Sequence, residues 1–239
     1  MSQQGLSRKG FPIECGFRPD GSSAKISQAT IEFLEDHCRN PRDVMGTDGW
    51  SVVVSTEKYS VSRRKIENQP VELVSGRFRM SIPPSRAFDI FYDPALRQQW
   101  DTNTTDFEIV DKIDDRNDVL LQRVRMPNPL GPRESLNSRF SRRADDEKNM
   151  PGLIAWRACV HAKVPIVKKP IRIWSMGSYL FEPMSDPSEC LLKFAIVSDP
   201  GGSLPKWLVN MVAPRILLRA FRRIEDIFAE SIKRRPSLC

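Results

Sequence analysis

The sequence has few of the residues on which most hydrolytic enzymes depend. It contains 2 histidines and 5 cysteines, and no two cysteines have Cys-x-x-Cys spacing. A serine or cysteine nucleophile needs a nearby base, most often histidine, and the chain has no Gly-x-Ser-x-Gly, His-Glu-x-x-His or phosphate-loop motif. We therefore expect no enzyme, no metal and no cofactor, although an enzyme that uses carboxylates alone stays open.

The sequence also lacks the features of a membrane-spanning or secreted protein. It has no apolar window of about 18 residues, the length that crosses a bilayer. The first residues, Met1-Ser-Gln-Gln-Gly, do not form a signal peptide. An odd number of scattered cysteines favours a reducing compartment. These features predict a cytoplasmic protein.

Positive charge is in excess. The chain carries 37 lysines and arginines against 30 aspartates and glutamates, a net charge of +7. Such an excess favours anionic partners, either lipid headgroups or nucleic acid. Aromatic residues make up only 8% of the chain, and the absence of any nucleic-acid motif argues against that partner. We expect transient contact with anionic membranes and no nucleic acid; a basic surface without a partner is the simpler alternative.

The apolar pattern predicts an α+β fold with an antiparallel sheet, because strands and helices are segregated along the chain. Helices are expected at 27–38, 84–92, 94–101 and 204–235, and strands at 50–56, 59–66, 71–82, 107–113, 119–126, 133–143, 153–161, 171–181 and 189–197. The apolar parity of 71–82 changes across Gly76, so a β-bulge is expected there. We assign a flexible arm to 1–25, one domain to 26–235 and a tail to 236–239.

The last expected helix is amphipathic. Pro205 lies in its first turn, where its missing N–H costs nothing, and Leu217, Phe221, Ile224 and Phe228 form one apolar stripe. A helix with such a stripe lies against an apolar surface, which here is the sheet. A sheet that wraps a long helix can hold a hydrophobic ligand between the two.

Four local strings resemble the START (steroidogenic-acute-regulatory-related lipid transfer) family. They are Gly49-Trp50, Phe91-Tyr-Asp-Pro-Ala-Leu-Arg-Gln-Gln-Trp-Asp101, Met126-Pro-Asn-Pro-Leu-Gly-Pro-Arg-Glu134 and Asp199-Pro-Gly-Gly-Ser-Leu-Pro-Lys-Trp-Leu-Val-Asn210. The second and fourth look most similar to the phosphatidylcholine-transfer branch. The resemblance implies a helix-grip fold, in which a curved antiparallel sheet and a long C-terminal helix enclose one lipid in an internal tunnel. It implies lipid binding and transfer without covalent chemistry, and we expect a monomer.

The resemblance assigns Arg97 and Asp101 to the headgroup end of the tunnel. They lie four residues apart and share a helix face. The guanidinium would contact a phosphate and the carboxylate would orient it. Phe91, in the same string, is expected to line the tunnel. The alternative is an ordinary surface ion pair that contributes little.

A polar line is expected to face the tunnel from the strand at 133–143. Alternation places Ser135, Asn137 and Arg139 on one side of this strand, which in the family points inward, and Gln122 on the neighbouring strand joins them. A buried guanidinium needs an anion or several acceptors, so Arg139 is a headgroup candidate. The alternative for Arg139 is an exposed edge position.

The expected identity of the lipid follows from a departure from the phosphatidylcholine-transfer branch. That branch binds choline in a cage of aromatic side chains. At the cage positions this sequence has Gln122 and Ser135 instead of aromatic residues. A phospholipid with a different headgroup is therefore favoured. A sterol or sphingolipid carrier stays open, as does a lipid sensor or scaffold that moves no lipid.

A lid is expected where glycines give the backbone freedom. These places are the loop 128–132, with Leu130 and Gly131, and the turn 198–204, with Gly201 and Gly202. The side chains expected to meet a bilayer are Leu130, Trp207, Leu208 and Met211, with core packing as the alternative for Trp207. Pro214 is expected to kink the last helix. Basic residues that could bind anionic lipid, or simply form a solvated face, are Lys163, Lys168, Lys169, Arg172, Arg215, Arg219, Arg222, Arg223, Lys233, Arg234 and Arg235.

Overall fold

The computed structural model describes residues 25–39, 49–66, 69–126 and 130–233, without the side chains of His37 and 229–233. The expected arm up to residue 24, Asn128 of the expected lid, and the tail with Arg234 and Arg235 lie outside these residues.

The elements are α1 (Gln28–Arg39), β1 (Trp50–Ser55), β2 (Tyr59–Arg64), β3 (Leu73–Met80), α2 (Pro84–Tyr92), α3 (Pro94–Trp100), β4 (Thr104–Lys112), β5 (Asn117–Val124), β6 (Arg133–Arg142), β7 (Gly152–Ala158), β8 (Ile171–Pro183), β9 (Cys190–Asp199) and α4 (Lys206–Lys233). The structure thus confirms every expected element and their order.

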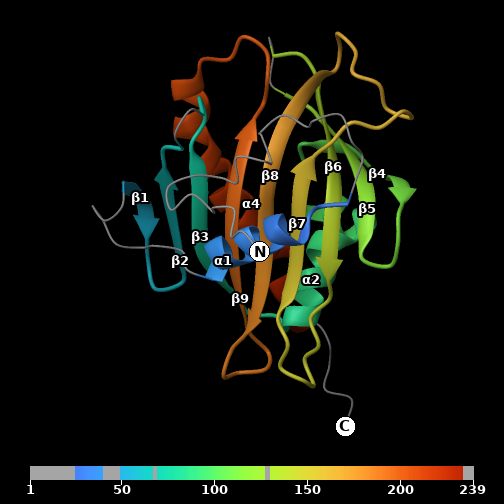
Figure 1. Cartoon of the computed structure of the whole chain (residues 1–239). Coiled ribbons are helices and arrows are strands. Elements are labelled where there is room, and N and C mark those ends of the chain that lie inside the picture. The colour runs from blue at the N-terminus through green and yellow to red at the C-terminus, as the bar shows by residue number, and fades with distance from the viewer. Residues whose placement is uncertain (1–24, 40–48, 67–68, 127–129, 234–239) are drawn as a thin grey trace, which may run out of the picture.

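The strands form one sheet in the order β1-β2-β3-β9-β8-β7-β6-β5-β4 (Figure 1). Neighbours in this order pair antiparallel, and β6 also makes a short parallel contact with β8, with Ser135 opposite Ile173. Among the described residues, the edge strands β1 and β4 do not pair with each other. The sheet is therefore open, and the antiparallel α+β prediction is confirmed.

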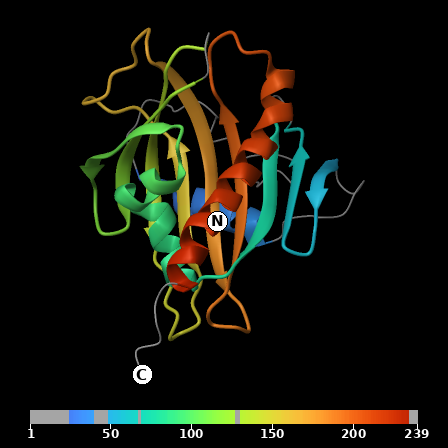
Figure 2. The ribbon, with the colours of Figure 1, turned by 180° about the vertical axis from the view of Figure 1, so that it is seen from behind.

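Helices cover both faces of the sheet. α4 crosses one face with α2 and α3 beside it (Figure 2), and α1 lies across the opposite face (Figure 1). We call the face under α4 the inner face and the face under α1 the outer face. The inner core is built around aromatic rings, among them Phe181, Phe194 and Phe221. The outer core contains Leu34 and Leu180, so the central strands are buried on both sides.

The bulge expected at Gly76 is wrong. β3 pairs in unbroken register through Gly76, which lies opposite Val61 of β2 and Phe194 of β9. A Cβ at this position would lie 2.0 Å from the backbone oxygen of Ser60, so the strand needs glycine because another strand approaches closely. The change of apolar parity has another cause: Leu73 packs in the outer core and Phe78 in the inner core.

The second half of α4 is buried more deeply than the first. Phe221, Ile224 and Phe228 are 1%, 0% and 4% exposed, which confirms the expected stripe. In the first half, Trp207 is 68% exposed, and the chain remains helical through Pro214. In the part of the chain that the structure describes, no helix has the length and apolar character that crossing a membrane requires.

Candidate functional site

Arg97 and Asp101 begin a polar cluster at the end of α3. Asp93 caps this helix by accepting hydrogen bonds from the N–H groups of Ala95 (2.7 Å) and Leu96 (3.2 Å). Arg97 Nε donates to Asp101 Oδ2 at 3.3 Å, and the two side chains are 14% and 17% exposed. They are therefore not an ordinary surface pair, because most of each side chain is removed from water.

Gln122 ties this pair to the sheet. Its Nε2 donates to Asp101 Oδ2 at 3.2 Å and to Thr104 Oγ1 at 2.6 Å. Asp101 therefore accepts from a guanidinium on its own helix and from an amide on β5. The shared carboxylate fixes the direction of both donors, as a binding site for a polar group requires.

Aromatic rings support Arg97 from the inner core. Its guanidinium carbon lies 4.2 Å from the centre of the Trp100 ring, and Trp100 is held by a 3.1 Å hydrogen bond from Nε1 to the carbonyl of Ile90. The Arg97 guanidinium is also close enough to the Tyr179 hydroxyl to affect its pKa. Burial raises the pKa of Tyr179, and the nearby positive charge of Arg97 opposes that shift only in part. Tyr179 is therefore neutral at physiological pH.

The strand register places the expected polar line on the inner face. Gln122 lies directly opposite Ser135, and Arg139 lies opposite Trp156, a residue of the inner core. Asn137 is buried beside Ser175, whose hydroxyl lies 3.2 Å from Asn137 Oδ1. The residues named from alternation are thus together on one face, while Leu136 of the same strand packs on the other.

Arg139 has an anion within the chain. It is 3% exposed, and it donates to both oxygens of Asp118, Nε to Oδ1 at 2.9 Å and Nη2 to Oδ2 at 2.7 Å. Its Nη1 donates to the carbonyl of Tyr92 at 3.0 Å, and the guanidinium carbon lies 4.0 Å from the Tyr92 ring centre. A bidentate partner and a stacked ring satisfy this buried charge, so Arg139 supports the site from within the protein. Its position is not the exposed edge considered as the alternative.

Phe91 is enclosed by other rings. It is 2% exposed and its ring centre lies 4.8 Å from Tyr179, 5.1 Å from Trp100, 5.3 Å from Phe181 and 6.1 Å from Phe221. This ring group closes the space between the sheet and the second half of α4. Phe91 therefore packs in the core.

Some apolar side chains of the inner face are less completely buried. Trp156 on β7 and Ile196 on β9 belong to the inner face of central strands, yet both are only partly buried. Ala213 and Leu217, which pack against the same core from α4, are also partly buried. The Trp156 ring centre lies 5.0 Å from that of Tyr179, the residue close to Arg97, so this partly exposed apolar surface reaches the polar cluster.

The loops expected to form the lid meet at the end of the sheet where α4 begins. Arg133 is 3% exposed and joins them, because it hydrogen-bonds the carbonyls of Gly131 and Pro200, the second at 3.0 Å. A cleft of about 400 Å³ opens beside this junction and is lined by residues that include Arg125, Leu130 and Arg133. One buried arginine therefore joins the two loops expected to form the lid.

Only the second expected lid segment needs glycine. Gly201 and Gly202 have φ angles of +67° and +69°, in the left-handed region that glycine favours. Gly131 has nothing within 4 Å of a built Cβ and no positive φ. The side chains expected to meet a bilayer differ in exposure: Trp207 and Met211 are 68% and 41% exposed, whereas Leu130 and Leu208 are partly buried.

Sequence reasoning missed three residues of this region. Asp118 lies between the expected strands 107–113 and 119–126, but β5 begins at Asn117 and the alternation that includes Gln122 extends back to Asp118. Arg133 has the same parity as Ser135 on β6, so the strand pattern could have found it. Tyr179 gave no local signal, because its approach to Arg97 depends on how α3 crosses β8.

Comparisons with known proteins fit this architecture. The family model for the START domain matches residues 45–232. START domain-containing protein 10 of Mus musculus is 24% identical over 214 residues, which cover 85% of this chain and 72% of that protein. Ceramide transfer protein of Xenopus laevis is 24% identical over 213 residues, covering 82% of this chain and 34% of the relative.

A solved structure has the same fold. The crystal structure of human STARD10 aligns with a TM-score of 0.72 at 21% identity and covers 91% of this chain and 87% of the other. The fold match and the family model agree with the order of elements and with the strings on α3, the lid loops and α4. The chain therefore belongs to the START domain family, as its sequence strings predicted.

Proposed function

We propose that this chain binds one lipid between the inner face of the sheet and the first half of α4, and transfers it between membranes without catalysis. The observation that carries the proposal is the partly buried apolar surface around Trp156 and Ile196, next to the polar cluster of Arg97, Asp101 and Gln122. Acyl chains suit the first surface and a polar headgroup suits the second. In this proposal the carrier is a cytosolic monomer that does not bind nucleic acid.

Arg97 and Asp101 select the headgroup in this proposal. A guanidinium that donates to a phosphate gives a charge-assisted hydrogen bond, and Asp101 and Trp100 hold Arg97 in place for it. A phospholipid is therefore the favoured ligand class. Ser135 and Asn137 supply further polar groups on the same face, and Arg139 and Phe91 act as supports for them.

The first experiment is native mass spectrometry of the purified protein after exposure to mixed phospholipid vesicles, followed by identification of any bound lipid. One bound phospholipid per chain supports the proposal. A protein that stays empty, and that moves no labelled lipid between donor and acceptor vesicles, overturns it. Lipid bound without transfer favours a sensor or scaffold.

Headgroup selection is tested with Arg97→Gln. Losing a hydrogen bond to a charged group costs about 1.5–3 kcal/mol, so phospholipid uptake should fall by about tenfold or more. Arg143→Gln is the matched control, because Arg143 pairs with Asp89 at 2.8 Å on the surface. Equal uptake by both variants would contradict the role of Arg97.

A sphingolipid carrier is the second candidate. One relative is named ceramide transfer protein, and ceramide has no phosphate. If ceramide is taken up and Arg97→Gln does not change its uptake, this candidate replaces the phospholipid.

A further inference from the structure

The loop between β7 and β8 presents an apolar tip. Ile166 and Val167 are adjacent in the sequence and are 55% and 49% exposed. Single exposed apolar residues are ordinary, but neighbouring ones indicate an interaction site. This pair lies outside the polar cluster and the lid.

The base of this loop is fixed to the sheet. His161 bridges to Val164, and its Nε2 lies 3.2 Å from Asp111 Oδ2 on β4. Arg172, which is 5% exposed, donates to the carbonyl of Val164 at 3.3 Å and to Glu134 at 2.8 Å. A tip on a fixed base loses little conformational entropy when it binds.

Basic side chains flank the tip. Lys163, Lys168 and Lys169 are exposed, and residues 159–170 contain no aspartate or glutamate. An apolar pair between lysines matches the interface of an anionic bilayer, because apolar groups enter below the headgroups while ammonium groups reach the phosphates.

The tip and the start of α4 project from the same end of the molecule. The loop extends beyond the sheet at the upper right of Figure 1, and α4 begins at the upper left. Between them, β8 begins against the turn that leads to α4: a Cβ built on Gly201 would lie 2.8 Å from the backbone oxygen of Arg172. The lid junction at Arg133 therefore lies between two exposed apolar points, the loop tip and Trp207.

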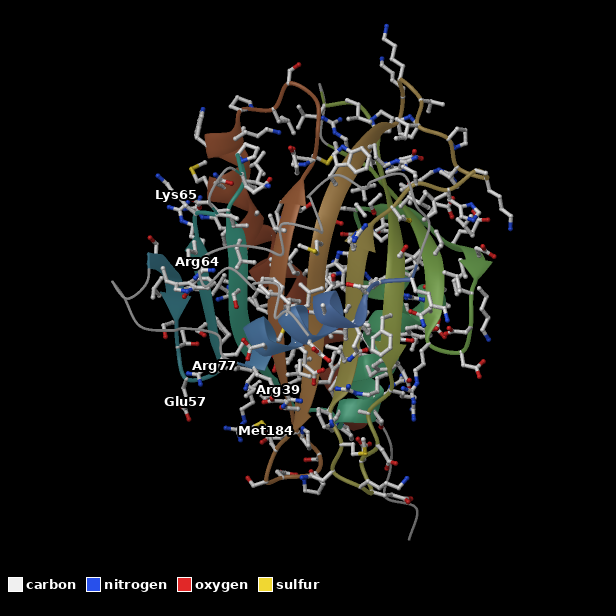
Figure 3. The ribbon with its side chains drawn as sticks, in the orientation of Figure 1. Arg39, Glu57, Arg64, Lys65, Arg77 and Met184 are labelled. Atoms are coloured by element: carbon white, nitrogen blue, oxygen red, sulfur yellow. The ribbon has the colours of Figure 1, made fainter. Side chains whose placement is uncertain are left out.

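A second basic group lies elsewhere and suits docking less well. Arg39, Arg64, Lys65 and Arg77 lie on the side of the molecule that carries α1, with Glu57 near them (Figure 3). Arg39 pairs with Glu35 at 2.6 Å, and the Arg64 guanidinium lies 5.1 Å from the Trp50 ring centre. Docking through this group would turn the outer face, rather than the lid, toward the membrane.

We propose that the β7–β8 loop is a second membrane anchor: Ile166 and Val167 insert into an anionic bilayer while Lys168 and Lys169 bind its headgroups. With Trp207 as the other anchor, the lid between them faces the bilayer. This inference rests on the proposed function, because it specifies where the carrier exchanges its lipid.

The test measures co-sedimentation of the full chain with phosphatidylcholine vesicles, with and without phosphatidylserine. Ile166→Ser/Val167→Ser and Lys168→Gln/Lys169→Gln should each weaken binding to the anionic vesicles. One lysine near such a surface contributes about fivefold in affinity, so the lysine variant should lose about tenfold or more.

Matched controls lie at the opposite end of the sheet. Met150→Ser removes an apolar side chain that is 47% exposed. Lys58→Gln/Lys148→Gln removes two lysines whose side chains are 49% and 73% exposed, so it changes the net charge as much as the loop variant does. Both controls should bind vesicles as the wild type does.

Uptake of a fluorescent short-chain phospholipid, presented as monomers, separates this inference from the proposed function. Loop variants should take up this probe normally, because it needs no bilayer. A wild type that binds anionic vesicles but takes up no probe contradicts the proposed function alone. Equal losses in loop and control variants, or no vesicle binding by the wild type, overturn the second anchor.

Discussion

Arg139 and Asp118 are the most completely buried ion pair on the inner face, with side chains 3% and 7% exposed. Removing one partner leaves a buried charge without compensation, which costs about 3–5 kcal/mol. Asp118→Asn should therefore lower the free energy of unfolding in urea by about that amount. Asp118→Leu/Arg139→Met should cost less than the single change, because it removes both charges. A double variant that is less stable than Asp118→Asn would contradict this account.

Sequence patterns predicted the face of Arg139 but not its partner. Alternation placed Ser135, Asn137 and Arg139 on one side of the strand, and the family resemblance implied that this side points inward. The pairing with Asp118 depends on the β5–β6 register, in which the two residues are directly opposite. Asp118 was outside the expected strands, since β5 begins at Asn117 whereas the expected strand began at residue 119.

At the scale of elements, the two halves of α4 have different roles. Phe221 is 1% exposed and contacts Phe78 and Phe194 at ring-centre distances of 5.8 and 5.0 Å. Phe221→Ala should therefore destabilise the domain by about 3–5 kcal/mol. Trp207→Ala, at a position 68% exposed, should change the free energy of unfolding by less than about 0.5 kcal/mol and still weaken vesicle binding. Thermal unfolding and co-sedimentation of the two variants check both expectations, and a large stability loss in Trp207→Ala would contradict them.

α1 is attached to the sheet partly through Glu35. Burial alone would raise the pKa of Glu35, but hydrogen bonds from Arg142 and Arg39 outweigh it and hold the pKa below its ordinary value of 4.5. A depressed pKa means that the ionised carboxylate stabilises the folded state. This contribution is complete above the unfolded pKa and is lost as the pH falls through the folded value.

The prediction for Glu35→Gln follows from that sign. At neutral pH the variant should be less stable than the wild type by about 1 kcal/mol or less. The difference should shrink below about pH 4, where Glu35 of the unfolded wild type becomes protonated. Urea unfolding of both proteins across this range measures it, and a difference that grows toward acid pH would contradict the pKa assignment.

At the scale of the whole molecule, lipid loading should protect one end more than the other. Trp156 and Ile196 are partly buried under the first half of α4, and a bound lipid would cover them. Amide hydrogen exchange should therefore slow at 206–217 and in the turn at 200–204 when phospholipid is bound, because local opening becomes less frequent. Exchange in the second half of α4 around Phe221 and Ile224, which are already 1% and 0% exposed, should change little. Equal protection everywhere would indicate general stabilisation instead of a ligand at this end.

The sequence by itself determined the elements, their order and the family. Alternation and helical periodicity are local properties, and the four strings lie within short segments, so they required no knowledge of how distant strands meet. They also marked Arg97, Asp101 and Gln122, which the structure places in one hydrogen-bonded cluster.

Tertiary structure alone decided which polar groups are satisfied within the protein and which side chains are packed in its core. Gly76 is a place of close strand approach and not a bulge, because Ser60 and Phe194 crowd it from neighbouring strands. The charge of Arg139 is paired with that of Asp118. Arg133 joins the two loops expected to form the lid, and Phe91 is buried among other aromatic rings. Each of these outcomes depends on residues far apart in the chain, whose distances follow from sheet register and helix crossing and not from local spacing.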